Sequence, residues 1–181
     1  NQSLGFILRN TKRLHDIDAL IMVYNALVRS KLEYCSSIWF PTTKKDSHRI
    51  ERIQDRFVRI LFYRQNGFYP SFPNQISYSD LLFHLNMASL SDRRKNADLT
   101  FLFKLINSQT SDSKLLNKLS FRFRCPGLRL KRLPLFSHDL YPKDSNLGRI
   151  TKLYDSFPDL DIFSSPGSFS NQLKLLSAVG S

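Results

Sequence analysis

The chain has few of the residues that build disulfide frameworks, zinc sites or membrane spans. Its 181 residues include two cysteines, Cys35 and Cys125, which lie 90 positions apart. Neither forms a closely spaced pair with another Cys or His, so neither a zinc motif nor a disulfide framework is indicated. No apolar run approaches the roughly 20 residues that a membrane-spanning helix needs. We therefore expect no membrane partner and a reducing intracellular location, either nucleus or cytoplasm.

The residues that polymerases, hydrolases and phosphate-binding enzymes use are also missing. Polymerases hold magnesium ions between paired carboxylates, yet no two aspartates are adjacent in this sequence. The Asp-x-Asp pairs are Asp16/Asp18, at a predicted helix start, and Asp159/Asp161, in a predicted loop. The four histidines lack metal-ligand spacing, and neither a Gly-rich phosphate loop nor a Gly-x-Ser-x-Gly motif occurs. We expect no catalytic residue, metal ligand or cofactor site in this chain.

Acidic residues are scarce relative to basic ones. There are 27 Lys and Arg against 15 Asp and Glu, which gives a net charge of +12. An excess of this size favours a polyanionic partner, because cations that contact phosphates release condensed counterions. The apolar fraction of 41% is sufficient for a folded core, and the length allows one domain or two small subdomains. Nucleic acid is therefore the partner class that the composition favours.

Most of the chain has the apolar periodicity of α-helices. From Leu14 to Leu32 the apolar residues lie on one helical face, with Asp16 as a candidate N-cap. Leu32 to Trp39 predicts a second, shorter helix with Cys35 on its buried face. Further helices are expected from residue 46 or 47 to about 63, and at 77–85, 89–105, 111–119, 146–157 and 163–176.

Residues 121–136 have a different pattern. Phe121 to Arg124 alternates with period two, which is typical of an edge strand, and Pro134 favours an irregular extended segment over a central strand. We therefore predict a mostly α fold with short extended basic segments. Its three parts are a helical bundle at 1–65, a helical connection at 66–120, and the basic extended segment with the C-terminal helices at 121–181.

A first basic group lies on the helix predicted after residue 46. It comprises Lys44, Lys45, Arg49, Arg52, Arg56 and Arg59. At about 100° per residue, the four arginines fall within roughly an 80° arc beside the apolar line of that helix. Residues 44–64 contain seven bases and three acids, so local ion pairs cannot neutralise them. A solvated helix face is the plainer interpretation, and contact with nucleic-acid phosphates is the one that we favour.

A second basic group lies in the extended region. It comprises Arg122, Arg124, Arg129, Lys131 and Arg132, and no acid occurs from residue 120 to 137. A flexible surface loop and a clamp on the nucleic-acid backbone fit this pattern equally well.

A third group, Arg93 to Lys95, stands at a predicted helix start. Positive charge there opposes the helix dipole, so an internal acid such as Asp92 or Asp98 is the expected partner.

The order of short motifs along the chain resembles a known family. The motifs are Leu4–Ile7, Ala19–Arg29, Leu32–Pro41, Ile50–Arg59, Asp92–Arg94, Asn146–Asp155 and Ser168–Leu173. Their order resembles the region after the catalytic palm in reverse transcriptases of non-LTR retrotransposons, particularly the jockey-like elements. Their order carries the resemblance, since no single motif is specific. Asp155 stands where asparagine is commoner, and Ser30 where proline often stands.

The resemblance implies a helical thumb and the region that follows it. Such a thumb would hold the backbone of an RNA–DNA duplex, or another nucleic-acid duplex, beside an upstream palm domain of the same parent chain. The magnesium ions of that RNA-directed DNA polymerase would belong to the palm, so the fragment itself would be non-catalytic. Two other interpretations remain open: a helical protein-interaction module with a basic face, and a degenerate inactive fragment.

Overall fold

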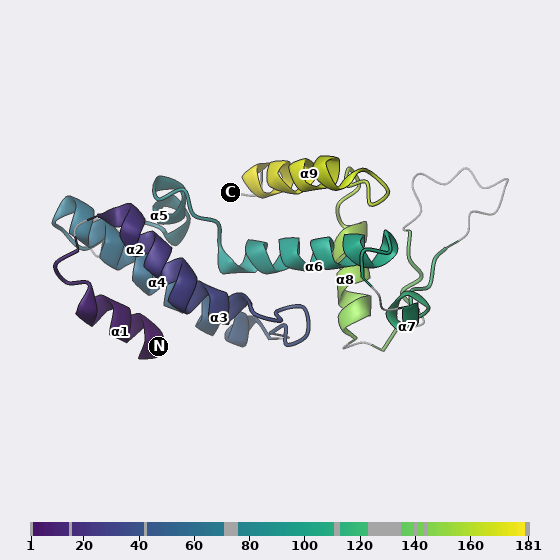
Figure 1. Ribbon diagram of the computed structural model, residues 1–181, viewed down its shortest axis with the longest axis horizontal. Coiled ribbons are helices and arrows are strands. Elements are labelled where there is room, and N and C mark those ends of the chain that lie inside the picture. Colours follow the sequence, from purple (N-terminus) through teal and green to yellow (C-terminus); the bar gives the residue numbers. More distant parts are fainter. Residues whose placement is uncertain are drawn as a thin grey trace. The chain divides into compact units, whose positions relative to one another are not determined.

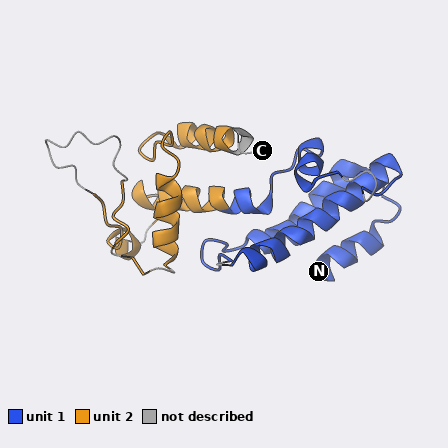
Figure 2. Cartoon of the chain, turned by 180° about the vertical axis from the view of Figure 1, so that it is seen from behind, with its two compact units in different colours: residues 1–94, 181 blue, residues 95–180 orange. Residues whose placement is uncertain are grey.

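The computed structural model describes residues 2–14, 16–41, 43–70, 76–110, 113–122, 135–139, 141–142 and 145–179, without the side chains of 177–179. These residues are mostly helical (Figure 1), so the predicted fold class is confirmed. The chain divides into two compact units, residues 1–94 with Ser181 and residues 95–180 (Figure 2). This division falls inside a helix, whereas the three parts expected from the sequence divide after residues 65 and 120.

Among its described residues, the first unit contains five complete helices and a π-helical segment. They are α1 (Gln2–Asn10), α2 (Ile17–Tyr24), η1 (Asn25–Arg29), α3 (Ser30–Glu33), α4 (Lys44–Asn66) and α5 (Tyr78–His84). Helix α6 (Leu90–Ile106) begins in this unit. Asp16 caps α2 as predicted, because its carboxylate accepts from the backbone N–H groups of Asp18 and Ala19.

Helix α4 is the longest element of the unit. The hydroxyl of Thr43 accepts from the N–H of Asp46 and caps the helix, so α4 begins before the predicted cap at residue 46 or 47. It ends at Gly67, whose φ of 78° lies in the left-handed region that favours glycine. The helix therefore extends three residues beyond the predicted end near Tyr63.

The core of the first unit joins α1, α2, α4 and α5. The rings of Tyr24 and Phe57 stack with centroids 4.0 Å apart and an interplanar angle of 9°. Around them lie the buried side chains of Leu4, Ile7, Leu20, Val28, Val58, Leu61, Phe62, Leu81 and Leu82. This packing fixes the rotation of α4 about its axis and so determines which of its side chains face solvent.

The prediction of a short helix from Leu32 to Trp39 is wrong. Residues 34–39 form turns after α3, and Cys35 has a φ of +53°, which reverses the chain. Cys35 is exposed rather than buried, and Ser36 is buried in its place. The apolar spacing continues through this segment, but Tyr34, with a ψ of 123°, leaves the helical conformation and Cys35 follows in the left-handed one. The helix therefore ends, and the following side chains change direction.

The second unit contains the rest of α6, followed by α7 (Ser113–Leu116), α8 (Asn146–Asp155) and α9 (Pro166–Val179). Phe103 of α6 stacks on Phe169 of α9 with centroids 4.3 Å apart. Two extended segments meet at an isolated antiparallel bridge between Phe121 and Phe136, where the N–H of Arg122 donates to the carbonyl of Leu135 at 2.9 Å. Residues 123–134, most of the predicted extended segment, lie outside the described residues.

Candidate nucleic-acid interface

Four cations of α4 form a line that we call the basic stripe: Lys45, Arg49, Arg52 and Arg56. All four side chains are exposed. With about 100° and 1.5 Å per residue, they fall within about 60° of one another and extend over about 16 Å of the helix. Length and alignment together make the stripe a surface that can contact several successive phosphates.

The stripe lies on the side of α4 opposite its packed side. Gln54, Phe57 and Leu61 are buried, and helical geometry places their line roughly 180° from the stripe. The sequence-based expectation had the arginines beside the apolar line. The difference arises because Ile50, Ile53 and Ile60, which contribute to the apolar line in the sequence, are only partly buried. The buried face is therefore centred further round the helix.

The cations of the stripe are largely open to ligands. Arg49 has a 3.6 Å ion pair with Asp46, but its side chain is 73% exposed, and exposed pairs of this kind contribute little. Lys45, Arg52 and Arg56 have no ion pair or hydrogen bond with any residue that the structure describes. Lys44 is exposed as well, but it lies about 100° from the stripe.

Arg59 differs from the other arginines of the predicted row because it donates hydrogen bonds to several groups of the protein. Its Nε donates to Asp55 Oδ1 at 2.8 Å, and its Nη1 donates to the carbonyl oxygens of Pro70 at 2.9 Å and Ile76 at 3.5 Å. Arg59 therefore connects α4 to Pro70, in the segment that follows the helix, and to Ile76, just before α5. Arg59 is therefore not part of the candidate interface.

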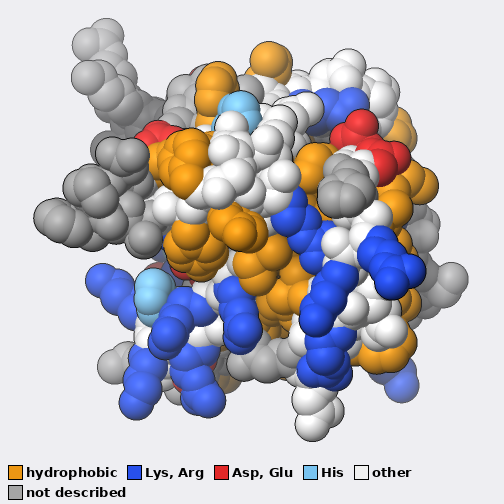
Figure 3. Space-filling view, turned by 90° about the vertical axis from the view of Figure 1, so that its left-hand side faces the viewer, with side chains coloured by type: hydrophobic (Ala, Val, Ile, Leu, Met, Phe, Trp, Pro, Cys, Tyr) orange, Lys and Arg blue, Asp and Glu red, His pale blue; other side chains and the backbone are white. Residues whose placement is uncertain are grey.

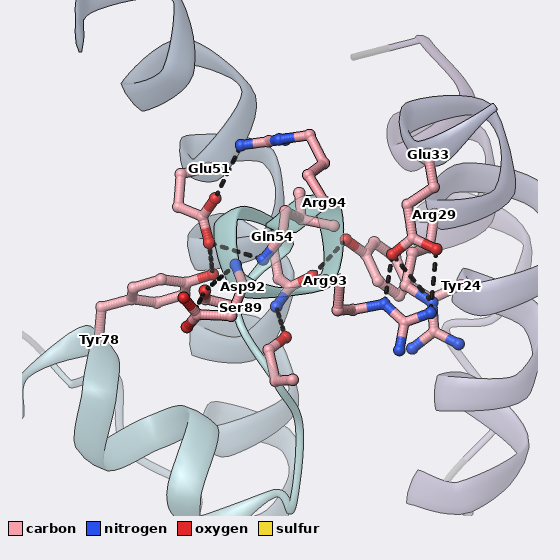
Figure 4. A network of polar contacts seen from close by, with 12 residues as sticks. Tyr24, Arg29, Glu33, Glu51, Gln54, Tyr78, Ser89, Asp92, Arg93 and Arg94 are labelled. Atoms are coloured by element: carbon pink, nitrogen blue, oxygen red, sulfur yellow. Dashed lines mark hydrogen bonds and ion pairs between the residues drawn. The ribbon is translucent and has the colours of Figure 1, made fainter. Parts of the chain in front are cut away.

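Several acids of the first unit are held in a polar network (Figure 4). Both carboxylate oxygens of Glu33 accept hydrogen bonds from Arg93. Oε1 of Glu51 accepts from the hydroxyl of Tyr78 at 2.8 Å and from the backbone N–H of Leu90 at 2.9 Å. Its Oε2 lies 3.7 Å from the guanidinium of Arg94, whose side chain is 1% exposed. The network therefore joins α3, α4 and α5 to the start of α6.

Burial and neighbouring charges shift the pKa of Arg93, Arg29, Tyr24 and Tyr78. The hydrogen bonds that Arg93 donates to Glu33 raise the pKa of Arg93. Burial, and to a smaller extent the nearby Arg93, lowers the pKa of Arg29. Burial raises the pKa of Tyr24 and of Tyr78, and the neighbouring carboxylate of Glu51 raises both further. Both tyrosines therefore remain neutral in the folded protein at physiological pH.

The third basic group of the sequence belongs to this network. An internal acid was expected for it, and the structure shows Glu33 with Arg93 and Glu51 with Arg94. Asp98 forms its own buried pair with Arg149 of α8 in the second unit. Because these partners come from other helices, local spacing could not identify them.

Glu33, Glu51 and Asp55, three of the eight acids of the first unit, form ion pairs with arginines of the same unit that lie outside the basic stripe. Residues 1–94 contain 14 Lys and Arg and 8 Asp and Glu, a net charge of +6, and Glu33, Glu51 and Asp55 bond inside the unit. On the face drawn in Figure 3, Lys and Arg side chains gather while few acidic ones are visible. An electropositive surface remains.

Sequence reasoning missed two further exposed cations, Lys12 and Arg13. Arg64, in the last turn of α4, donates to the carbonyls of Thr11 at 2.9 Å and Leu14 at 3.4 Å. The turn that carries Lys12 and Arg13 is therefore held against the C-terminal end of α4. The run from Arg9 to Arg13 without an acid was the available signal.

Arg122 is the one member of the second basic group that lies within the described residues. Its side chain is exposed and lies 3.5 Å from Asp139. Arg124, Arg129, Lys131 and Arg132 lie outside the described residues, so the second clamp stays a prediction.

Within the described part of the chain, no three His, Cys, Asp or Glu side chains cluster as metal ligands would. None of the helices described there is long and apolar enough to cross a membrane. Comparison with known proteins finds no matching family model, no matching curated protein and no matching solved structure.

Proposed function

We propose that this chain is the non-catalytic, template–primer-holding part of an RNA-directed DNA polymerase of a mobile element. The observation that carries the proposal is the basic stripe: four aligned and exposed cations, opposite the packed side of a helix whose acids Glu51 and Asp55 pair with arginines outside the stripe. Cations in such a line contact phosphates without reading the bases. The order of motifs resembling the non-LTR reverse transcriptases supports the polymerase context.

In this proposal the chemistry belongs to the palm of the parent chain. That palm would hold the magnesium ions, and the first unit would position the backbone of an RNA–DNA duplex by phosphate contact. Binding is then nearly independent of base sequence and weakens steeply as salt increases.

A protein-interaction module is the second candidate function. Large apolar side chains are exposed on the first unit at Met22, Tyr34, Ile38 and Phe83, and exposed apolar surface is typical of protein contacts. In the polymerase proposal, the palm is the protein that these side chains would meet.

Binding of labelled probes by the full chain separates the two functions. The probes are an RNA–DNA duplex, a DNA duplex of unrelated sequence and an acidic polypeptide, each titrated at several salt concentrations. The proposed function predicts similar affinity for duplexes of different sequence and weaker binding to the polypeptide. Binding to the polypeptide without binding to either duplex would select the protein-interaction module instead.

A further inference from the structure

Two exposed tyrosines stand at the C-terminal end of α4. Tyr63 is 49% exposed and Tyr69 46% exposed, and their ring centroids are 6.4 Å apart with an interplanar angle of 53°. Rings that are tilted at this distance do not cover one another's faces. Aromatic side chains usually bury most of their surface, so this half-exposed pair, which we call the tyrosine pair, presents flat apolar surface to solvent.

The tyrosine pair continues the line of the basic stripe. Tyr63 follows Arg56 by seven residues, which corresponds to about 10 Å along α4 and a rotation of only about 20°. Tyr69 belongs to the segment after the helix, and Arg59 holds that segment to α4 through the carbonyl of Pro70. Phosphate-binding cations and an open aromatic surface therefore follow one another along one side of the same helix.

More positive charge lies at the same end of α4. The turn with the exposed Lys12 and Arg13 is fixed there by the bonds of Arg64 to Thr11 and Leu14. A nucleic-acid strand that leaves the stripe would thus reach aromatic rings and further cations together. This is the combination by which proteins bind single strands: cations follow the backbone, and aromatic rings stack on bases.

We propose that the tyrosine pair stacks on unpaired bases of a nucleic acid whose paired part lies along the basic stripe. The inference rests on the proposed function and specifies its ligand, a duplex with a single-stranded extension. Base pairs in the interior of a duplex are stacked on both faces and cannot cover these rings, whereas the bases of an extension are free to do so. Stacking is tolerant of sequence, because every base has a flat face.

Fluorescence anisotropy with the full chain tests this inference. The probes are a blunt RNA–DNA duplex and the same duplex with a single-stranded extension that carries 2-aminopurine, whose emission falls when its base stacks. The proteins are wild type, Y63L/Y69L, Y63F/Y69F and Y34L. The last replaces an exposed tyrosine that lies outside α4 and serves as the matched control. Circular dichroism checks that each variant is folded.

We expect wild type to prefer the extended duplex and to quench the 2-aminopurine emission. Y63L/Y69L should lose roughly 5- to 140-fold in affinity for the extended duplex, the range for one stacked base. It should still bind the blunt duplex like wild type. Y63F/Y69F, which keeps both rings, and Y34L should retain the preference and the quenching.

Equal binding of both probes by wild type would overturn the stacking inference and leave the stripe intact as a duplex-binding surface. Unaltered preference and quenching in Y63L/Y69L would overturn it as well. Failure of wild type to bind the blunt duplex would instead refute the proposed function itself.

Discussion

Glu51 is the residue whose loss should destabilise the first unit most clearly. Replacing it with glutamine leaves an amide oxygen that can still accept from the hydroxyl of Tyr78 and the N–H of Leu90. The change removes the negative charge that Glu51 places 3.7 Å from Arg94, whose side chain is 1% exposed. Glu51→Gln therefore tests how much the carboxylate of Glu51 contributes beside the buried guanidinium of Arg94.

Removing one partner of a buried ion pair costs about 3–5 kcal/mol. We expect a loss of about 3 kcal/mol in the free energy of unfolding, the lower end of that range. The reasons are the 3.7 Å separation of the charges and the 16% exposure of the Glu51 side chain, which leave some solvent screening. Glu51→Ala should cost more, because it also leaves the two donors unsatisfied.

Urea unfolding, followed by the fluorescence of Trp39, the single tryptophan, measures the change. Arg49→Gln is the matched control, since it breaks an ion pair that is 73% and 51% exposed and should cost less than about 1 kcal/mol. The double variant Glu51→Gln/Arg94→Met should recover part of the loss, because it also removes the buried charge. If Glu51→Gln is as stable as Arg49→Gln, the network does not hold the unit together as described.

Three further perturbations have defined outcomes. Burial holds the pKa values of Tyr24 and Tyr78 above 10.0, so the unfolded chain loses these protons first. Below about pH 10 the two tyrosines should make their full contribution to the free energy of unfolding. Above that pH, the free energy of unfolding should fall by up to about 1.4 kcal/mol per pH unit for each tyrosine. Urea midpoints at rising pH measure this, and a shallower fall in Y24F/Y78F would support the assignment. In the second unit, Gly148→Ala places its Cβ 2.8 Å from Cβ of Tyr141, whose hydroxyl is held by the N–H of Ser120. This overpacking should lower the free energy of unfolding by about 1–3 kcal/mol, which thermal unfolding measures. Gly5→Ala is the control: its added Cβ lies 3.5 Å from the nearest side-chain atom, so it should be neutral or stabilising. Arg59→Gln should lower the free energy of unfolding by about 1–3 kcal/mol, because it removes a charged donor from two carbonyls, and an unchanged urea midpoint would contradict that role.

Three helix starts could be predicted from the sequence because capping is local, whereas the cap of α4 is Thr43 and not residue 46 or 47. Asp16, Ser77 and Ser89 were each expected to begin a helix, and each side chain accepts from a backbone N–H two or three residues later. Cys35 shows the limit of the same reasoning. Its apolar spacing continued a helix, but the backbone turns at Cys35 with a φ of +53°, which spacing does not encode.

The candidate site was predictable where it depends on one helix. The alignment of Arg49, Arg52 and Arg56 follows from helical geometry alone, and their exposure agrees with the prediction. Arg59 has the same spacing, yet its guanidinium donates a hydrogen bond to the carbonyl of Pro70, 11 residues later. Glu33 and Arg93 are separated by 60 positions, so only the packing of α3 near α6 reveals that they meet.

Salt dependence of duplex binding is the most direct test of the basic stripe. Wild type and R49Q/R52Q/R56Q are titrated with an RNA–DNA duplex at several salt concentrations, with R59Q as the control, since Arg59 is bonded inside the protein. The plot of log affinity against log salt should become shallower by about 0.9 for each lost phosphate contact in the triple variant. R59Q should keep the wild-type slope. An unchanged slope and affinity in the triple variant would contradict the claim that these cations hold the nucleic-acid backbone.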